Sequence, residues 1–125
     1  MTATRGTSNG NASGNSRDRA ARRAWLVATF RADVDVLLYV DDDDRPILIN
    51  GRAETIAAMP AQTPTSAGWS PACRCYRCGT LLTVDTVTAD RIIPGCKGGT
   101  YRRDNLRPAC GPCNSFTGGS LRGSK

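Results

Sequence analysis

The stretch that decides the fold of this chain is CYRCGTLLTVDTVTADRIIPGCKGGTYRRDNLRPACGPCN, residues 75–114. Two Cys-x-x-Cys pairs bracket it, Cys75 with Cys78 and Cys110 with Cys113. Two intervening residues let both sulfurs of a pair turn to the same side of a tight knuckle, and four thiolates fill one tetrahedral zinc site. The spacing therefore predicts a closed, structural zinc site made by these four cysteines.

Two further cysteines stand outside this pattern. Cys73 lies two residues before Cys75, so these two thiols could compete for one zinc position. We assign zinc to Cys75 because its spacing to Cys78 is that of the usual knuckle. Cys96 has no partner at knuckle spacing, and we interpret it as an incidental thiol.

The insert between the cysteine pairs carries an ordered set of further motifs. They are Asp90-Arg91-Ile92-Ile93-Pro94, Gly98-Gly99, Asn105-Leu106, and Asn114 directly after the last cysteine. In this order they resemble the HNH nuclease family, whose pattern has two knuckles, D-H-I-x-P, a GG loop, an N-L pair, and a His or Asn after the last cysteine. The resemblance covers about the last third of the chain. It implies an α+β fold with a small zinc-stapled ββα-metal module (HNH or His-Me finger), in which a β-hairpin packs on a helix around a divalent metal.

The resemblance implies a metal-dependent endonuclease that hydrolyses phosphodiester bonds of DNA. Asp90 and Asn114 would hold one Mg²⁺ or Mn²⁺ ion through oxygen ligands, and Asn105 would fix the hairpin loop and orient the base. The chain departs from the pattern at Arg91, which replaces the family's first histidine, and the chain contains no histidine. An arginine has a pKa above about 12, so Arg91 cannot act as a general base near neutrality and we expect slow cleavage. Arg91 could instead grip the scissile phosphate, and Asp85 is a conceivable substitute base.

The charge distribution favours a polyanion as the partner. The formal net charge is +6, and residues 71–125 carry nine Lys or Arg against three Asp. Five side chains near the motifs could contact phosphates, namely Lys97, Tyr101, Arg102, Arg103 and Arg107. Nothing resembles a base-reading helix, so we expect phosphate-dominated DNA binding with weak sequence preference. The alternative is a basic surface that only faces solvent.

Proteins of this family are common in tailed bacteriophages and mobile elements. Some act beside the DNA-packaging terminase, which makes that machine a candidate partner by resemblance alone. Two other functions stay open. One is a catalytically silent zinc-binding module that binds DNA or a packaging protein. The other is an RNA-binding zinc-knuckle protein, which would leave Asp90 and Asn114 unexplained.

Localisation follows from what the N-terminus lacks. Residues 1–16 contain no signal peptide, and no stretch approaches the roughly 20 apolar residues of a membrane span. We therefore expect an intracellular protein of the host-cell cytoplasm, not secreted, where thiols stay reduced and bind metal. Three disulfides in a secreted chain are the disfavoured alternative.

At 125 residues, the chain is expected to form one domain with tails. We expect a disordered tail over 1–17, a helix plus hairpin over 18–50, a loop or linker over 51–72, the zinc-bound module over 73–120, and a tail over 121–125. Within the module we expect strands over 81–83, 86–93 and 106–109. A short helix should follow from Gly111 or Pro112 and end at Gly118-Gly119.

The segment 18–50 is predicted from two patterns. Leu26, Phe30 and Val34 recur every four residues, which indicates an amphipathic helix over 18–32, capped by Ser16 or Asp18. The arginines of this helix could lie along a phosphate backbone or simply face solvent. The apolar runs 34–40 and 46–50 predict a hairpin, with the four Asp of residues 41–44 at its turn. These Asp lack the spacing and the glycine of a calcium loop.

Overall fold

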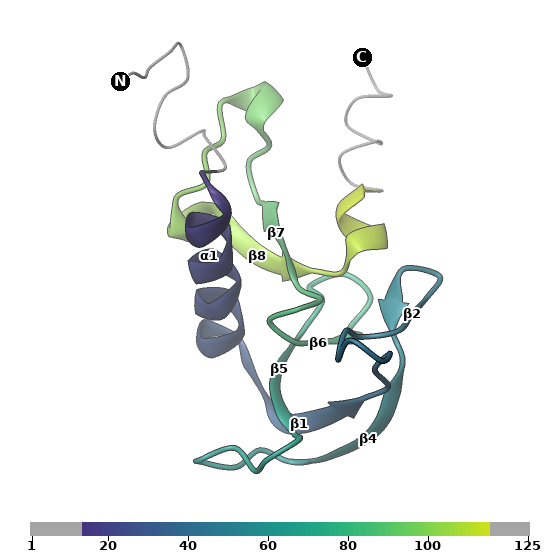
Figure 1. The fold of residues 1–125 in the computed structure, drawn as a ribbon. Coiled ribbons are helices and arrows are strands. Elements are labelled where there is room, and N and C mark those ends of the chain that lie inside the picture. The colour runs from purple at the N-terminus through teal and green to yellow at the C-terminus, as the bar shows by residue number, and fades with distance from the viewer. Residues whose placement is uncertain (1–13, 116–125) are drawn as a thin grey trace.

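The computed structural model describes residues 14–115, and Figure 1 shows their arrangement. In chain order the elements are α1 (Ser16–Thr29), β1 (Arg31–Leu38), β2 (Leu48–Ile49), β3 (Arg52–Ala53), β4 (Thr55–Pro60), β5 (Ser70–Arg74), β6 (Leu81–Leu82), β7 (Thr88–Arg91), the 3-10 turns η1 (Gly95–Lys97) and η2 (Arg103–Asn105), and β8 (Leu106–Ala109). Residues 111–115 form a helical segment after β8. This small mixture of helix and sheet confirms the α+β class. The tail expected over 121–125, most of the tail expected over 1–17, and the expected helix end at Gly118-Gly119 lie outside the described residues.

Helix α1 begins at a capping box. The Asn15 side chain accepts a hydrogen bond from the Asp18 backbone N–H at 2.9 Å, and the Asp18 carboxylate accepts the Asn15 N–H at 3.4 Å. Two N–H groups of the first turn are thereby satisfied. The predicted cap at Ser16 or Asp18 is therefore wrong, because the cap is Asn15 and Asp18 is its partner. The helix ends at Thr29, earlier than predicted, and buries Leu26 and Val27.

The main sheet is antiparallel with the strand order β4-β1-β5-β6. Val36 of β1 pairs with Ala58 of β4 and with Ser70 of β5, so β1 is a central strand. The prediction of a loop over 51–72 is wrong where β3, β4 and the start of β5 lie, and it holds for residues 61–69, which contain no strand. A central strand needs hydrogen-bond partners on both edges, and β4 and β5 supply them.

The hairpin predicted between 34–40 and 46–50 is formed only at its turn. The single isolated bridge there joins Val40 to Pro46, and the Asp41 side chain accepts the N–H groups of Asp43 and Arg45 at 2.9 and 3.0 Å. This side-chain bonding confirms a turn with an exposed acidic tip.

A second hairpin, with a two-residue turn, follows in the chain and was not predicted from the sequence. Strands β2 and β3 pair across Asn50 and Gly51, whose φ angles are 54° and 79°. Positive φ at both central residues is typical of a type I′ turn, which Asn-Gly favours strongly. The Asn-Gly dipeptide was therefore the signal that could have located this hairpin.

The cysteine-bearing module contains the antiparallel pair β7 and β8, in which Asp90 lies opposite Arg107. Strand β8 has the predicted bounds. Strand β7 is shorter than the predicted 86–93. It begins later because the N–H groups of Thr86 and Val87 bond back to the Thr83 carbonyl and form a turn, and it ends at Arg91. Helix α1 contacts both strands, as Figure 1 shows at the left of the molecule.

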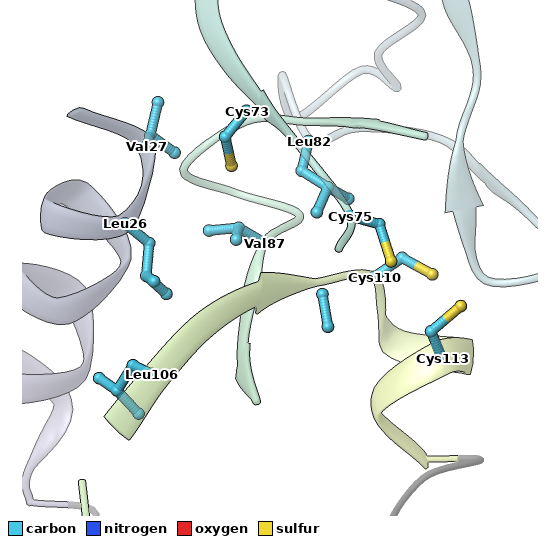
Figure 2. Packing of buried hydrophobic residues seen from close by; sticks show 10 residues of the cluster. Leu26, Val27, Cys73, Cys75, Leu82, Val87, Leu106, Cys110 and Cys113 are labelled. Carbon is cyan, nitrogen blue, oxygen red and sulfur yellow. The ribbon is translucent and has the colours of Figure 1, made fainter. Parts of the chain in front are cut away.

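One core joins the parts that the sequence assigned to separate segments. Leu26 and Val27 of α1 pack with Leu82, Val87 and Leu106 and with the cysteines of the C-terminal module (Figure 2). The main sheet also joins β1 and β4 to β5 and β6. The N-terminal half therefore forms one packed unit with the cysteine-bearing module.

Candidate metal centre and nuclease-like site

Four cysteine sulfurs meet at one place. The Sγ atoms of Cys75, Cys78, Cys110 and Cys113 all lie within 4.8 Å of one another. A tetrahedron with Zn–S bonds of about 2.3 Å has edges of about 3.8 Å, and the Sγ atoms of Cys78 and Cys110 are 3.7 Å apart. The donor set and its spacing thus fit a structural metal such as zinc. This confirms the four-cysteine site predicted from the spacing.

The surroundings of the cluster shift the pKa values of two of these thiols in opposite directions. Burial opposes ionisation of Cys75, but backbone N–H groups, first that of Cys78, lower its pKa to about 6. Burial raises the pKa of Cys110 to about 12, and neighbouring thiols add to the rise. Four thiolates this close repel one another, so complete ionisation needs a cation among them. A bound zinc ion would meet this requirement.

The two remaining cysteines lie elsewhere. Cys73 is fully buried in β5, and burial raises the pKa of its thiol to about 11. Figure 2 shows the Cys73 sulfur pointing into the core, away from the gathered sulfurs of Cys75, Cys110 and Cys113. The choice of Cys75 over Cys73 is therefore confirmed. Cys96 is exposed in η1.

Arg52, which the sequence reading missed, lies beside the cysteine cluster. A hydrogen bond with the Cys78 side chain and the charge of Cys110 raise the pKa of the Arg52 guanidinium. The adjacent Gly51 packs so closely that an added Cβ would lie 2.7 Å from Pro112 Cγ. The β2–β3 hairpin therefore packs against the helical segment, and the positive charge of Arg52 lies next to the cysteine thiols.

Asn114, in the helical segment, contacts β7, the strand that carries Asp90. Thr88 and Asp90 are two residues apart on β7, so their side chains point the same way. Asn114 Nδ2 donates to Thr88 Oγ1 at 3.0 Å and to the Ala89 carbonyl at 3.3 Å. Both contacts use Nδ2, which leaves Oδ1 as the amide atom that could bind a metal. One carboxylate and one amide oxygen suit a hard cation that keeps several waters.

The carboxylate of Asp90 has a protein partner as well. Asp90 is 3% exposed, and its Oδ2 accepts a hydrogen bond from Arg107 Nε at 2.7 Å. The Arg107 guanidinium also lies over the Tyr76 ring, 3.7 Å from its centroid. The sequence predicts Arg107 as a phosphate contact, whereas here it pairs with Asp90 across the strands.

Asn105 ties the ends of the loop between β7 and β8. Its Oδ1 accepts the Ile93 N–H at 2.8 Å, and its Nδ2 donates to the carbonyls of Ile93 and Thr100 at 3.0 and 2.7 Å. An asparagine side chain can accept and donate at once, so it can bridge both sides of a loop. Asn105 thereby fixes where Tyr101 sits.

Arg91 extends across this loop to an aromatic ring. Its Cζ atom lies 4.3 Å from the Tyr101 ring centroid, and Arg22 of α1 lies 4.6 Å from the same centroid. The other predicted phosphate contacts, Lys97, Arg102 and Arg103, are exposed.

Asp85, the candidate substitute base, is exposed and lines a cavity of about 440 Å³. The lining of that cavity also includes Arg23, Thr88 and Gly111. Asn114 is not among its lining residues. Within the described residues 14–115, Asp85 and Asp90 are not joined by a hydrogen bond.

Comparison with known proteins adds one match. Residues 75–123 match the family model described as HNH endonuclease. No curated protein and no solved structure matches the chain. Within residues 14–115, no helix combines the length and the apolar character that a membrane span requires. With its four-cysteine cluster, the segment 75–123 is thus similar to the zinc-binding variant of the HNH endonuclease family, which indicates a nuclease or nucleic-acid-related function.

Proposed function

We propose that this protein is a metal-dependent DNA endonuclease of HNH type that hydrolyses phosphodiester bonds. The observation that carries the proposal is that Asn114, in the helical segment, bonds to Thr88 of β7, the strand that carries Asp90 two residues further on. Their oxygens would hold one Mg²⁺ or Mn²⁺ ion. When bound, such an ion supplies Lewis-acid stabilisation of the phosphate.

The chain's own residues would orient the site and the substrate. Arg107 holds the Asp90 carboxylate in one orientation through its hydrogen bond at 2.7 Å. Arg91, stacked on Tyr101, would grip a phosphate through its planar fork of donors. With arginine in the base position, the roughly 10²–10⁴ in rate that a general base contributes is absent, and cleavage is slow.

DNA is the proposed partner, through phosphate contacts with weak sequence preference. The exposed side chains of Lys97 and Arg102 support this, and Arg103 is exposed as well, with its Cζ atom 5.3 Å from the centroid of the Trp25 ring. Nothing in the described part of the chain supports a terminase as partner.

A second candidate function is a catalytically silent module that binds nucleic acid. The Asp90–Arg107 ion pair favours it, because a buried carboxylate already paired at 2.7 Å is electrostatically satisfied without a metal. In that case Asp90 would stabilise the β-hairpin only.

A plasmid-nicking assay with Mg²⁺ or Mn²⁺ distinguishes the two functions. The zinc-loaded parent should nick, whereas Asp90→Asn and Asn114→Ala should each lose about 10²-fold or more. Asp90→Asn keeps an acceptor oxygen for Arg107, so a thermal melt should show a retained fold. Asp33→Asn, the same charge change at an exposed position of β1, is the matched control and should nick like the parent.

Two results would count against the endonuclease. A parent that binds DNA but does not nick with either metal supports the silent module. Equal nicking by the parent and Asp90→Asn would show that Asp90 holds no catalytic ion.

A further inference from the structure

A basic cavity of about 240 Å³ lies where α1 meets the β7–β8 hairpin. Its polar lining consists of Arg19, Arg22, Arg23, Thr88, Tyr101 and Asn114. Among the described residues that line it, none is acidic. The cavity therefore concentrates positive charge beside the amide that marks the nuclease-like site.

We propose that this cavity is a phosphate-binding subsite for the DNA backbone, built by the N-terminal helix next to the candidate cleavage site. The inference rests on the proposed function only in taking Asn114 as the marker of that site. It assigns to α1, which lies outside the segment 75–123, a direct part in substrate binding.

The helix presents its arginines as one group. Arg19, Arg22 and Arg23 are spaced i, i+3 and i+4, so they lie on the same face of α1. Like charges at this spacing repel, and the Asp18 of this helix is engaged in the capping box with Asn15. A bound anion would offset this repulsion between the three cations that line the cavity.

Hydrogen bonds and stacking hold each arginine in place before any ligand arrives. Arg19 Nη1 donates to the Gly14 carbonyl at 2.7 Å, and Arg23 Nε donates to the Val84 carbonyl at 3.2 Å. Arg22 lies over the Tyr101 ring at 4.6 Å. Each of these two hydrogen bonds uses one of the five guanidinium donors, so the remaining donors of that side chain are held in a fixed orientation.

The size and continuity of the cavity indicate a polymer's phosphate. At about 240 Å³ it is smaller than the roughly 300–1,000 Å³ pockets that enclose a whole small ligand. It shares Arg23, Val87 and Thr88 with the neighbouring cavity of about 440 Å³. A nucleic-acid strand that places one phosphate here would continue along the Arg23 side of the next cavity, whose lining also includes the acidic Asp85.

The test measures how DNA affinity depends on salt, without added Mg²⁺ or Mn²⁺ and therefore without cleavage. Fluorescence anisotropy of a labelled short duplex gives the slope of log affinity against log salt for the full, zinc-loaded chain. Arg19→Gln combined with Arg22→Gln should make this slope shallower by about 1.8, because each lost phosphate contact removes about 0.9. Arg17→Gln removes one charge, as Arg19→Gln alone does, from an exposed position of α1 outside the cavity and should leave the slope unchanged.

Each outcome decides the proposal. A parental slope in the double variant overturns it, and so does an equal change in Arg17→Gln, because helix charge alone would then explain binding. If the double variant fails to fold, Arg19→Gln decides alone with an expected change of about 0.9. Tighter binding of duplex RNA than of duplex DNA overturns the DNA assignment. A parent that never nicks but shows these slopes would refute the endonuclease while keeping the subsite.

Discussion

Replacing Asn105 by alanine should loosen the loop between β7 and β8 while the domain stays folded. The substitution deletes three hydrogen bonds, one accepted from Ile93 N–H and two donated to the carbonyls of Ile93 and Thr100. The backbone bonds from Ile92 N–H to the Asn105 carbonyl and from Asn105 N–H to the Arg102 carbonyl remain, both at 2.8 Å. The effect should therefore be local.

The size of the effect follows from these contacts. A net contribution of about 0.5–1.5 kcal/mol per hydrogen bond gives about 1.5–4.5 kcal/mol for three. Two of the three bonds are exposed, so water replaces part of the loss and the low end applies. A local destabilisation of about 2 kcal/mol corresponds to about 30-fold more opening of the loop.

Amide hydrogen exchange measures this directly. The Ile93 amide should exchange about 30-fold faster in Asn105→Ala than in the parent. The Tyr76 amide, bonded to the Pro108 carbonyl at the knuckle, should keep its parental rate. Asn105→Asp is the matched control, because its carboxylate still accepts the Ile93 N–H but cannot donate, and Ile93 should remain better protected than in the alanine variant.

Unchanged exchange at Ile93 in Asn105→Ala would refute the reasoning, since the side-chain bonds would then not hold the loop. Equal acceleration at Ile93 and Tyr76 would also refute it, because the domain rather than the loop would have opened.

Metal analysis should find about one zinc per chain, and chelation should unfold the cysteine-bearing module, because zinc-binding free energy in small domains is largely folding free energy; folded, zinc-free protein would contradict this. A thiol reagent should modify exposed Cys96 rapidly in zinc-loaded protein and buried Cys73 only after unfolding, which a colorimetric thiol count would follow in time. Arg91→His should raise the rate of plasmid nicking by up to about 10²–10⁴-fold, because histidine supplies a base with an ordinary pKa of about 6.5. A lower rate in both Arg91→His and Arg91→Ala would instead mark Arg91 as a phosphate contact. Arg102→Ala combined with Arg103→Ala should flatten the salt dependence of DNA binding by up to about 1.8 in slope, and a parental slope would remove both from the contact surface.

The sequence by itself determined the features that depend on local spacing. Two residues between the cysteines of each pair are enough to direct both sulfurs to one side, so the cluster of Cys75, Cys78, Cys110 and Cys113 could be predicted from the letters alone. The bounds of β8 and the acidic turn at 41–44 were also local and predictable. The Asn50-Gly51 turn was equally local, and it was missed because residues 46–50, with Asn50, were assigned to one strand of a different hairpin.

Only the tertiary structure decided what lies around that cluster. Strand β4 looked like a loop, because its small residues show no strong pattern and its strand state depends on pairing with β1. Arg107 could not be separated from the exposed arginines, because its pairing with Asp90 depends on the strand register. The arginines of α1 line the same cavity as Asn114 only because Leu26 and Val27 pack the helix against the β7–β8 side of the core. Such contacts join residues tens of positions apart, and short-range periodicity carries no information about them.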